Sequence, residues 1–336
     1  MSESTSATNT LSAPTPVLSV SPIVLPAPGR AVELQVRVSA PVTGSELPII
    51  LLSHGHGRSN HLSSLNGYAP LANYYAAHGF VVIQPTHLDS KTLTLDSKDP
   101  DAPLYWRARV QDMKRILDQL DAIERAVVGL AGRLDRSKVA VIGHSMGGHT
   151  ASLLLGARHT ASHGGTEVNL AEPRIKAGVL LAAPGRGDAL SKFAAENYPF
   201  FSTIDFSTMT TPALVVAGDK DDSAYLTVAG ADWHADPYFL SPSPKSLLTL
   251  FDAGHGLGES RGMTSPRPRT RTPSEWPPCS VSPGPTSAPR STPETPPAAS
   301  AKRADGRRRA ARTGRVQISE GGPSVVAGVA PEAMKV

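Results

Sequence analysis

Apolar residues in this chain of 336 residues fall into short runs that alternate with longer amphipathic stretches. Short aliphatic runs, typical of buried strands, occupy residues 48–53, 80–85, 138–142, 175–182, 211–218 and 246–251. Helical spacing predicts helices over 64–78, 104–130 and 148–157. This alternation predicts an α/β fold, a mostly parallel central sheet with helices on both faces. Two earlier runs, 17–25 and 31–39, read as strands, and the second alternates apolar and polar residues as an antiparallel edge does.

The longest amphipathic stretch, 104–130, has an apolar stripe that includes Met113, Ile116 and Leu120. Such a stripe indicates a helix packed on the core. We expect Arg107 and Arg109 on the same helix to be solvated.

Two insertions after strand ends, 87–103 and 185–210, lie where a substrate site would be. The second is rich in aromatic residues: Phe193, Tyr198, Phe200, Phe201 and Phe206. These side chains either line a substrate pocket or form a satellite core under a long loop. No long lid is evident, so small or fairly exposed substrates fit better than deeply buried ones.

The most informative motif is G-H-S-M-G at residues 143–147, which follows a strand and precedes a helix. This is the context of a nucleophile elbow, in which a strained turn lifts the serine hydroxyl, here that of Ser145, clear of the backbone. Glycines two before and two after the serine let strand and helix approach closely.

A serine nucleophile needs a histidine base and a carboxylate to orient it, in the chain order Ser, acid, His. Asp219, Asp221 and Asp222 follow the strand 211–218, and His255 lies between two glycines after the strand 246–251. We favour Asp221 as the acid, with Asp222 as the alternative. Asp219 suits the turn itself. Among other histidines only His234 also follows the acid, and it lacks a preceding strand.

The oxyanion hole is expected to use the backbone N–H of Met146 and that of His56, in the Gly-rich loop 53–59. His54, His56 and His61 could suggest a metal site, but their spacing is a weak signal without a nearby carboxylate. Serine chemistry needs no metal and no cofactor.

These motifs, S-H-G-H-G, G-H-S-M-G-G, A-G-D-K-D-D and a late G-H-G, resemble those of an α/β-hydrolase over about residues 30–258. Within that superfamily the chain is most similar to the branch of platelet-activating-factor acetylhydrolases, chlorophyllases, dienelactone hydrolases and cutinase-like polyesterases. The resemblance implies hydrolysis of a small-molecule carboxylic ester through an acyl-enzyme on Ser145. A catalytically impaired scaffold and an amide or thioester hydrolase with the same triad are the alternatives, and the oligomeric state stays open.

Composition narrows the setting of this domain. The single cysteine, Cys279, excludes an internal disulfide. Residues 1–16 are predicted to be disordered and lack a secretory signal, no apolar run is long enough for a membrane span, and no nucleotide-binding motif occurs. We therefore expect a cytoplasmic enzyme with its hydrolase domain at 17–258.

The last segment, 259–336, differs in composition from the rest of the chain. It holds 13 of the 33 Lys and Arg residues but 6 of the 29 Asp and Glu, so the first 258 residues carry a net charge of −3. Rich in Pro and Arg, the segment is predicted to be a disordered tail. The fold normally has a last helix here. One set of codons for residues 276–286, read two bases later, encodes AAVQRLTWAY, an amphipathic helix. We hypothesise that the tail is an out-of-frame reading that begins near Gly258. Binding of nucleic acid or anionic lipid by its arginines is the rival interpretation, which is disfavoured because Trp276 is the only aromatic residue in the segment and no recognition fold is visible.

Overall fold

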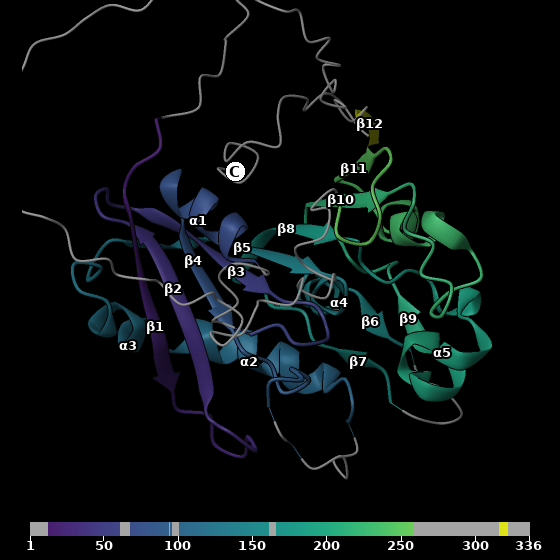
Figure 1. The fold of residues 1–336 in the computed structure, drawn as a ribbon, viewed down its shortest axis with the longest axis horizontal. Helices are drawn as coiled ribbons and strands as arrows, with labels where there is room; N and C mark the ends of the chain where they lie inside the picture. The colour runs from purple at the N-terminus through teal and green to yellow at the C-terminus, as the bar shows by residue number, and fades with distance from the viewer. Residues whose placement is uncertain are drawn as a thin grey trace, which may run out of the picture. The chain divides into compact units, whose positions relative to one another are not determined.

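We describe the protein from a computed structural model, which describes residues 13–60, 68–93, 95, 101–160, 166–257 and 316–321. Its main sheet has nine strands in the order β1-β2-β4-β3-β5-β8-β10-β11-β12 (Figure 1). In chain order they are β1 (Val17–Leu25), β2 (Leu34–Pro41), β3 (Leu47–Ser53), β4 (Val81–Pro85), β5 (Leu134–His144), β8 (Ile175–Leu181), β10 (Ala213–Gly218), β11 (Lys245–Leu250) and β12 (Val316–Gly321).

The centre of this sheet is parallel and its margins are antiparallel. The strands β4, β3, β5, β8, β10 and β11 run parallel to one another. The pairs β1–β2, β2–β4 and β11–β12 are antiparallel. Because parallel strands end at the same edge, the loops after β5, β10 and β11 meet there. The predicted mostly parallel α/β sheet is confirmed.

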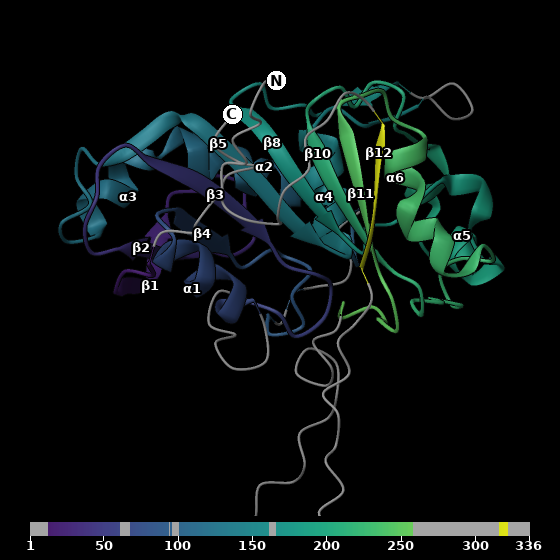
Figure 2. The same ribbon diagram turned by 90° about the horizontal axis from the view of Figure 1, so that it is seen from above.

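Helices cover both faces of the sheet. They are α1 (Ala69–Ala77), α2 (Trp106–Asp118), α3 (Leu120–Ala126), α4 (Met146–Leu154), α5 (Lys192–Asn197) and α6 (Asp236–Phe239), with the short 3-10 turns η1 (Gly187–Ala189), η2 (Pro199–Thr203) and η3 (Gly230–Ala235). Figure 2 shows α1 on the opposite side of the sheet from α3. Every helix in the described ranges is too short or too polar to cross a bilayer.

The alternation of side chains along β3 explains why two cores form. Ile49 and Leu51 pack in one core with residues of α2, α3 and α4, whereas Ile50 and Leu52 pack in the other with residues of α1. Successive side chains of a strand point to opposite faces, so a strand that is apolar throughout must be covered on both sides.

The predicted helix over 104–130 is in fact two helices, α2 and α3, that meet at Gln119. The N–H of Gln119 bonds to the carbonyl of Ile116, and its side-chain amide donates to the carbonyls of Arg115 and Pro26. The side chain thus takes a carbonyl that a continuous helix would use itself and ties it to the segment after β1. Periodicity alone gives no sign of such a tertiary contact.

The aromatic insertion 185–210 contributes to packing. Phe201 and Phe206 are buried in the main core, and Tyr198 and Phe200 pack against it, whereas Phe193 is 49 % exposed. The ring of Phe200 stacks on that of Trp106 at 5.7 Å. A small second sheet, in the order β7 (Val168–Asn169), β6 (Arg158–His159), β9 (Ile204–Asp205), borders this cluster. The buried members of this group therefore have a packing role, within the main core rather than in a satellite core under a loop.

The chain divides into two units, 1–264 with 314–336, and 265–313. The second unit lies outside the described residues, as do the predicted disordered N-terminus up to residue 12 and the proposed start of the frame change at Gly258. Within the segment predicted to be a tail, Val316–Gly321 forms β12, antiparallel to β11.

Candidate active site

Ser145 lies between β5 and α4, in the turn predicted to be a nucleophile elbow. Its φ of 54° and ψ of −120° place a non-glycine residue in a region that L-residues rarely adopt. The turn is held because the Ser145 N–H donates to the carbonyl of Leu181 at 2.9 Å. Strain of this kind persists only where the surroundings enforce it, and it is concentrated at functional sites.

The two glycines of the motif make the turn possible. A Cβ at Gly143 would lie 2.0 Å from the carbonyl oxygen of Gly147, and a Cβ at Gly147 would lie 2.0 Å from that of Ser53. Neither position has room for a side chain. These contacts are the close approach that the sequence predicts, and they also bring the start of α4 against the end of β3.

His255 and Asp221 contact each other directly. His255 Nδ1 lies 2.7 Å from Asp221 Oδ2. Their loops are joined because the N–H of Lys220 donates to the carbonyl of Ala253 at 2.9 Å. A Cβ at Gly218 would lie 2.3 Å from that same carbonyl oxygen, so the glycine that ends β10 lets the histidine loop approach.

The three competing carboxylates occupy different environments. Asp221 is buried, Asp222 is exposed, and Asp219 forms an ion pair with Lys220 at 3.5 Å. Burial alone would raise the pKa of Asp221, but hydrogen bonds from His234 and His255 hold that pKa below its usual range. Asp221 is therefore the ionised carboxylate that faces His255, and Asp222 is not in contact with it in this geometry.

His144, the residue before Ser145, links the elbow to the His255 loop. Its Nε2 lies 2.8 Å from the carbonyl oxygen of His255, and its Nδ1 lies 2.8 Å from the hydroxyl of Tyr68, which accepts a hydrogen bond from the N–H of Gly55. Burial, and then the charge of His255, lower the pKa of His144 to about 4. A neutral His144 thus donates to His255 and accepts from Tyr68.

Sequence reasoning did not assign a role to His144 or Tyr68. The only signal was the position of His144 inside the motif itself. The rings of His144 and His255 lie 5.0 Å apart. His255, which lies between two glycines, is thus anchored through its own carbonyl group.

The loop that contains His56, predicted to form part of the oxyanion hole and called the oxyanion loop below, lies beside Ser145. A Cβ at Gly55 would lie 3.3 Å from Cβ of Ser145, so the predicted donor loop and the elbow are in contact. Met146 is the first residue of α4, where backbone N–H groups have no partner within the helix. His56 follows Gly55 in the same loop, and the structure thus brings both predicted oxyanion donors to the region of Ser145.

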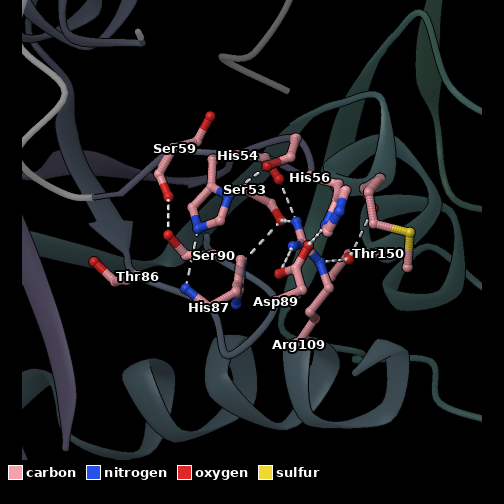
Figure 3. Close-up of polar contacts among 12 residues, drawn as sticks. Ser53, His54, His56, Ser59, Thr86, His87, Asp89, Ser90, Arg109 and Thr150 are labelled. Atoms are coloured by element: carbon pink, nitrogen blue, oxygen red, sulfur yellow. Dashed lines mark hydrogen bonds and ion pairs between the residues drawn. The ribbon is translucent and has the colours of Figure 1, made fainter. Parts of the chain in front are cut away.

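Arg109 is not solvated, which corrects the expectation from sequence. It is fully buried, donates to the carbonyl of His54 and the carboxylate of Asp89, and donates to Thr150 Oγ1 at 2.9 Å and Ser53 Oγ at 3.3 Å (Figure 3). It lies three residues after Trp106 and four before Met113, on the buried stripe of α2, which was the signal available in the sequence. Arg107 is exposed as expected.

Asp89 connects this buried arginine to the oxyanion loop. Its second carboxylate oxygen lies 3.0 Å from His56 Nδ1 (Figure 3). Burial opposes ionisation of Asp89, but the charge of Arg109 and the bond to His56 lower its pKa. A carboxylate therefore does lie beside His56, contrary to the expectation from sequence. The linked side chains of Arg109, Asp89 and His56 hold this loop in place.

The side chains of His54 and His56 bond to different partners in this network of buried polar residues. His54 Nδ1 lies 2.7 Å from the carbonyl of Gly55, and its Nε2 accepts from the N–H of His87 at 3.0 Å. Burial, and then Arg109, lower the pKa of His54 to about 4. The third histidine of that group, His61, lies outside the described residues.

His234, the lower-ranked histidine, contacts the same carboxylate as His255. Its Nε2 lies 3.0 Å from Asp221 Oδ2, and its side chain is buried. No strand precedes His234 in the sequence pattern, because this residue lies on η3 rather than on a loop directly after a strand.

Comparison with known proteins identifies the family to which this chain belongs. The family model described as alpha/beta hydrolase family matches residues 49–310. The chain is 31 % identical over 190 residues to Cutinase 1 of Thermobifida cellulosilytica, covering 55 % of this chain and 53 % of that protein. It is equally similar to a cutinase of Thermobifida fusca strain YX, covering 46 % of the relative.

A third relative, platelet-activating factor acetylhydrolase of Cavia porcellus, is 28 % identical over 155 residues, which cover 36 % of this chain and 34 % of that one. The chain spans about half the length of the cutinases it matches. The family match covers most of the chain and includes the elbow, the acid loop and the histidine loop. The protein therefore belongs to the alpha/beta hydrolase family.

Proposed function

We propose that this protein is a serine hydrolase that cleaves carboxylic esters through an acyl-enzyme. The observation that carries the proposal is the strained Ser145 at the elbow, one residue from a histidine that bonds to the His255 loop, with His255 2.7 Å from the buried Asp221. The relatives are ester hydrolases, cutinases and an acetylhydrolase, which supports the same chemistry.

In the proposed mechanism the hydroxyl of Ser145 attacks the acyl carbon, and Nε2 of His255 accepts its proton. Asp221 accepts the Nδ1–H of His255 and stabilises the imidazolium that forms. The N–H groups of Met146 and His56 stabilise the oxyanion. His255 then gives the proton to the leaving alcohol, and a water molecule activated by His255 releases the acid and restores Ser145.

The framework around the site supports this assignment over an impaired scaffold. His144 donates to the His255 carbonyl and the Arg109–Asp89 pair fixes the oxyanion loop, so the predicted groups do not depend on the tail for every contact. Turnover of a small-molecule ester requires no cofactor in this scheme. The cytoplasmic location stays a prediction.

The first test is the variant Ser145→Ala, assayed with p-nitrophenyl acetate. We expect kcat/KM to fall roughly a thousandfold or more, because the nucleophile is removed. Ser152→Ala is the matched control. Ser152 lies on α4 and its hydroxyl donates to the carbonyl of Gly148 within the helix, so this variant should retain activity. Equal turnover by Ser145→Ala and the parent protein would contradict the proposal.

A fluorophosphonate probe tests the site independently of the substrate. The parent protein should be labelled at Ser145 and the alanine variant should not. Comparison of short-acyl and long-acyl oxygen esters with thioesters and amides of matched acyl groups then assigns the substrate class. A preference for the thioester or amide of the same acyl group would replace the ester assignment with the alternative that shares the triad.

A further inference from the structure

Two histidines approach one carboxylate oxygen of Asp221, His255 in a hydrogen bond and His234 in a close contact. His255 Nδ1 lies 2.7 Å from Oδ2, and His234 Nε2 lies 3.0 Å from the same atom. The triad needs only the first of these contacts. His234 is 1 % exposed and reaches Asp221 from η3.

The hydrogen-bond partners of His234 determine how many protons its ring carries. Nδ1 lies 2.9 Å from the carbonyl oxygen of Ala183, which only accepts, so Nδ1 carries a proton. Nε2 faces Asp221 Oδ2 at 3.0 Å and Ser223 Oγ at 3.2 Å.

Ser223 does not supply a proton to His234. Its hydroxyl donates to the other carboxylate oxygen of Asp221, Oδ1, at 2.7 Å, which leaves only lone pairs for His234. Both neighbours of Nε2 are therefore acceptors, and a bare Nε2 would point its lone pair at a carboxylate. Only a ring with protons on both nitrogens satisfies all three contacts.

We propose that His234 is a buried imidazolium that offsets the charge of Asp221 and thereby keeps His255 active at lower pH. The inference rests on the proposed function for its consequence in catalysis, whereas the protonation of His234 stands on the contacts alone. His234 acts through Asp221 and is a positioning residue.

The physical effect follows from the charges around His255. An ionised carboxylate at hydrogen-bond distance stabilises the protonated form of His255, which cannot accept a proton from Ser145. A positive ring at His234, whose centroid lies 5.6 Å from that of His255, disfavours a second positive charge. His255 therefore stays neutral to lower pH than it would beside Asp221 alone. His234 holds its protons throughout the cycle, while one proton passes between Ser145, His255 and the leaving group.

The other ionisable groups near His234 leave this balance intact. His144 is neutral, since burial lowers its pKa to about 4. On the adjoining helix, Asp236 is bound by the side chain of Arg186 at 2.9 Å. Asp232 on η3 is exposed to solvent, and Tyr225 is 60 % exposed.

The decisive variant is His234→Gln, whose side-chain amide can still donate to Asp221 but carries no charge. The test is the pH profile of kcat/KM for p-nitrophenyl acetate, whose acid limb reports protonation of the essential base. We expect its midpoint to move to higher pH by roughly one to two units, from the loss of a unit charge at this separation. His78→Gln, at the C-terminal end of α1 and bonded to the carbonyl of Tyr74, should leave the midpoint in place. An unchanged or lower midpoint in His234→Gln would overturn the proposal.

A second measurement uses the unmodified protein and needs neither folding of a variant nor turnover. In protein labelled with 15N-histidine, both ring nitrogens of His234 should report as protonated at neutral pH. A single protonated nitrogen overturns the proposal. The same spectrum after dialysis against EDTA should be unchanged, whereas a change would show that a metal ion, not a proton, lies between the ring and Asp221, and would also overturn it. Lack of ester turnover in the unmodified protein would contradict the proposed function and leave the charge of His234 as measured.

Discussion

At the residue scale the site depends on backbone geometry that few residues allow. Ser145 adopts a positive φ of 54°, and such conformations cost on the order of 1–3 kcal/mol for a non-glycine residue. The strain is tolerated because the glycines on either side let β5, α4 and β3 close around the turn. The glycines of the motif are needed because any side chain at these positions would clash with neighbouring backbone, and not because they make the turn flexible.

Gly147→Ala tests this close approach. Its Cβ would lie 2.0 Å from the carbonyl oxygen of Ser53, a backbone atom that cannot move without shifting β3. We expect the free energy of unfolding to fall by roughly 1–3 kcal/mol or more, measured by urea denaturation. In Gly254→Ala the new Cβ would lie 3.8 Å from the carbonyl oxygen of Lys220, an ordinary contact, so stability should change by less than about 0.5 kcal/mol. Equal effects of the two substitutions would show that packing is not the reason for Gly147.

At the scale of elements, α2 is connected to the segments around the site through one buried arginine, Arg109. The guanidinium of Arg109 joins α2 to the oxyanion loop at His54, to α4 at Thr150, and to the segment after β4 at Asp89 (Figure 3). Three elements that carry predicted catalytic groups or their neighbours are thus fixed relative to one another. A buried charge of this kind is stable only with all of its partners present.

Arg109→Met removes the charge and leaves Asp89 buried without its arginine. We expect the free energy of unfolding to fall by about 3–5 kcal/mol, because an unpaired buried carboxylate remains. Arg107→Met on the same helix is the control. Arg107 is 52 % exposed and pairs with Asp101 at the surface, so its removal should cost less than about 1 kcal/mol. Urea denaturation of both variants measures the difference, and a similar small loss in each would mean that the Arg109–Asp89 pair does not hold these elements together.

The features of the elements that the sequence predicted correctly depend on the local pattern of residues. The strands, the chain order of the serine, acid and histidine motifs, and the turn at Ser145 could be predicted. They follow from periodicity and from glycines at fixed spacing, which are visible in the sequence itself. The break at Gln119, the burial of Arg109 and the second contact to Asp221 from His234 depend on partners far away in sequence. A charged or polar residue on a helix gives no local sign of which distant carbonyl or carboxylate it will meet. The apolar spacing around Arg109 indicated its face, but its partners were visible only in three dimensions.

At the scale of the whole molecule, the parallel sheet brings the ends of β3, β5, β10 and β11 to one edge, and the predicted site residues follow these strands. The edge strand β12 comes from the segment predicted to be a tail. The hypothesis that this segment is an out-of-frame reading stays a prediction. Sequencing the gene tests it, and an alternate frame without a helix-like stretch after residue 258 would reject it.

Acid should destabilise the folded molecule because several buried histidines are neutral in it. Burial is the main cause that lowers the pKa of His54, His144 and His159 to about 4. An unfolded histidine has a pKa of about 6.5, so between about pH 6.5 and 4 the unfolded state binds more protons, and stability falls as pH falls. Asp112 acts in the opposite direction, since burial raises its pKa to about 6 and the folded state then binds the extra proton.

Three histidines outweigh one aspartate, and each unopposed group contributes up to about 1.4 kcal/mol per pH unit. We therefore expect the urea midpoint to be lower at pH 5 than at pH 7. His159→Phe should reduce this dependence by removing one group, whose ring already packs on that of Trp106 at 4.4 Å. A midpoint that is constant or higher at pH 5 would mean that these histidines are not held neutral by the fold. A dependence that His159→Phe leaves unaltered would assign the effect to other groups.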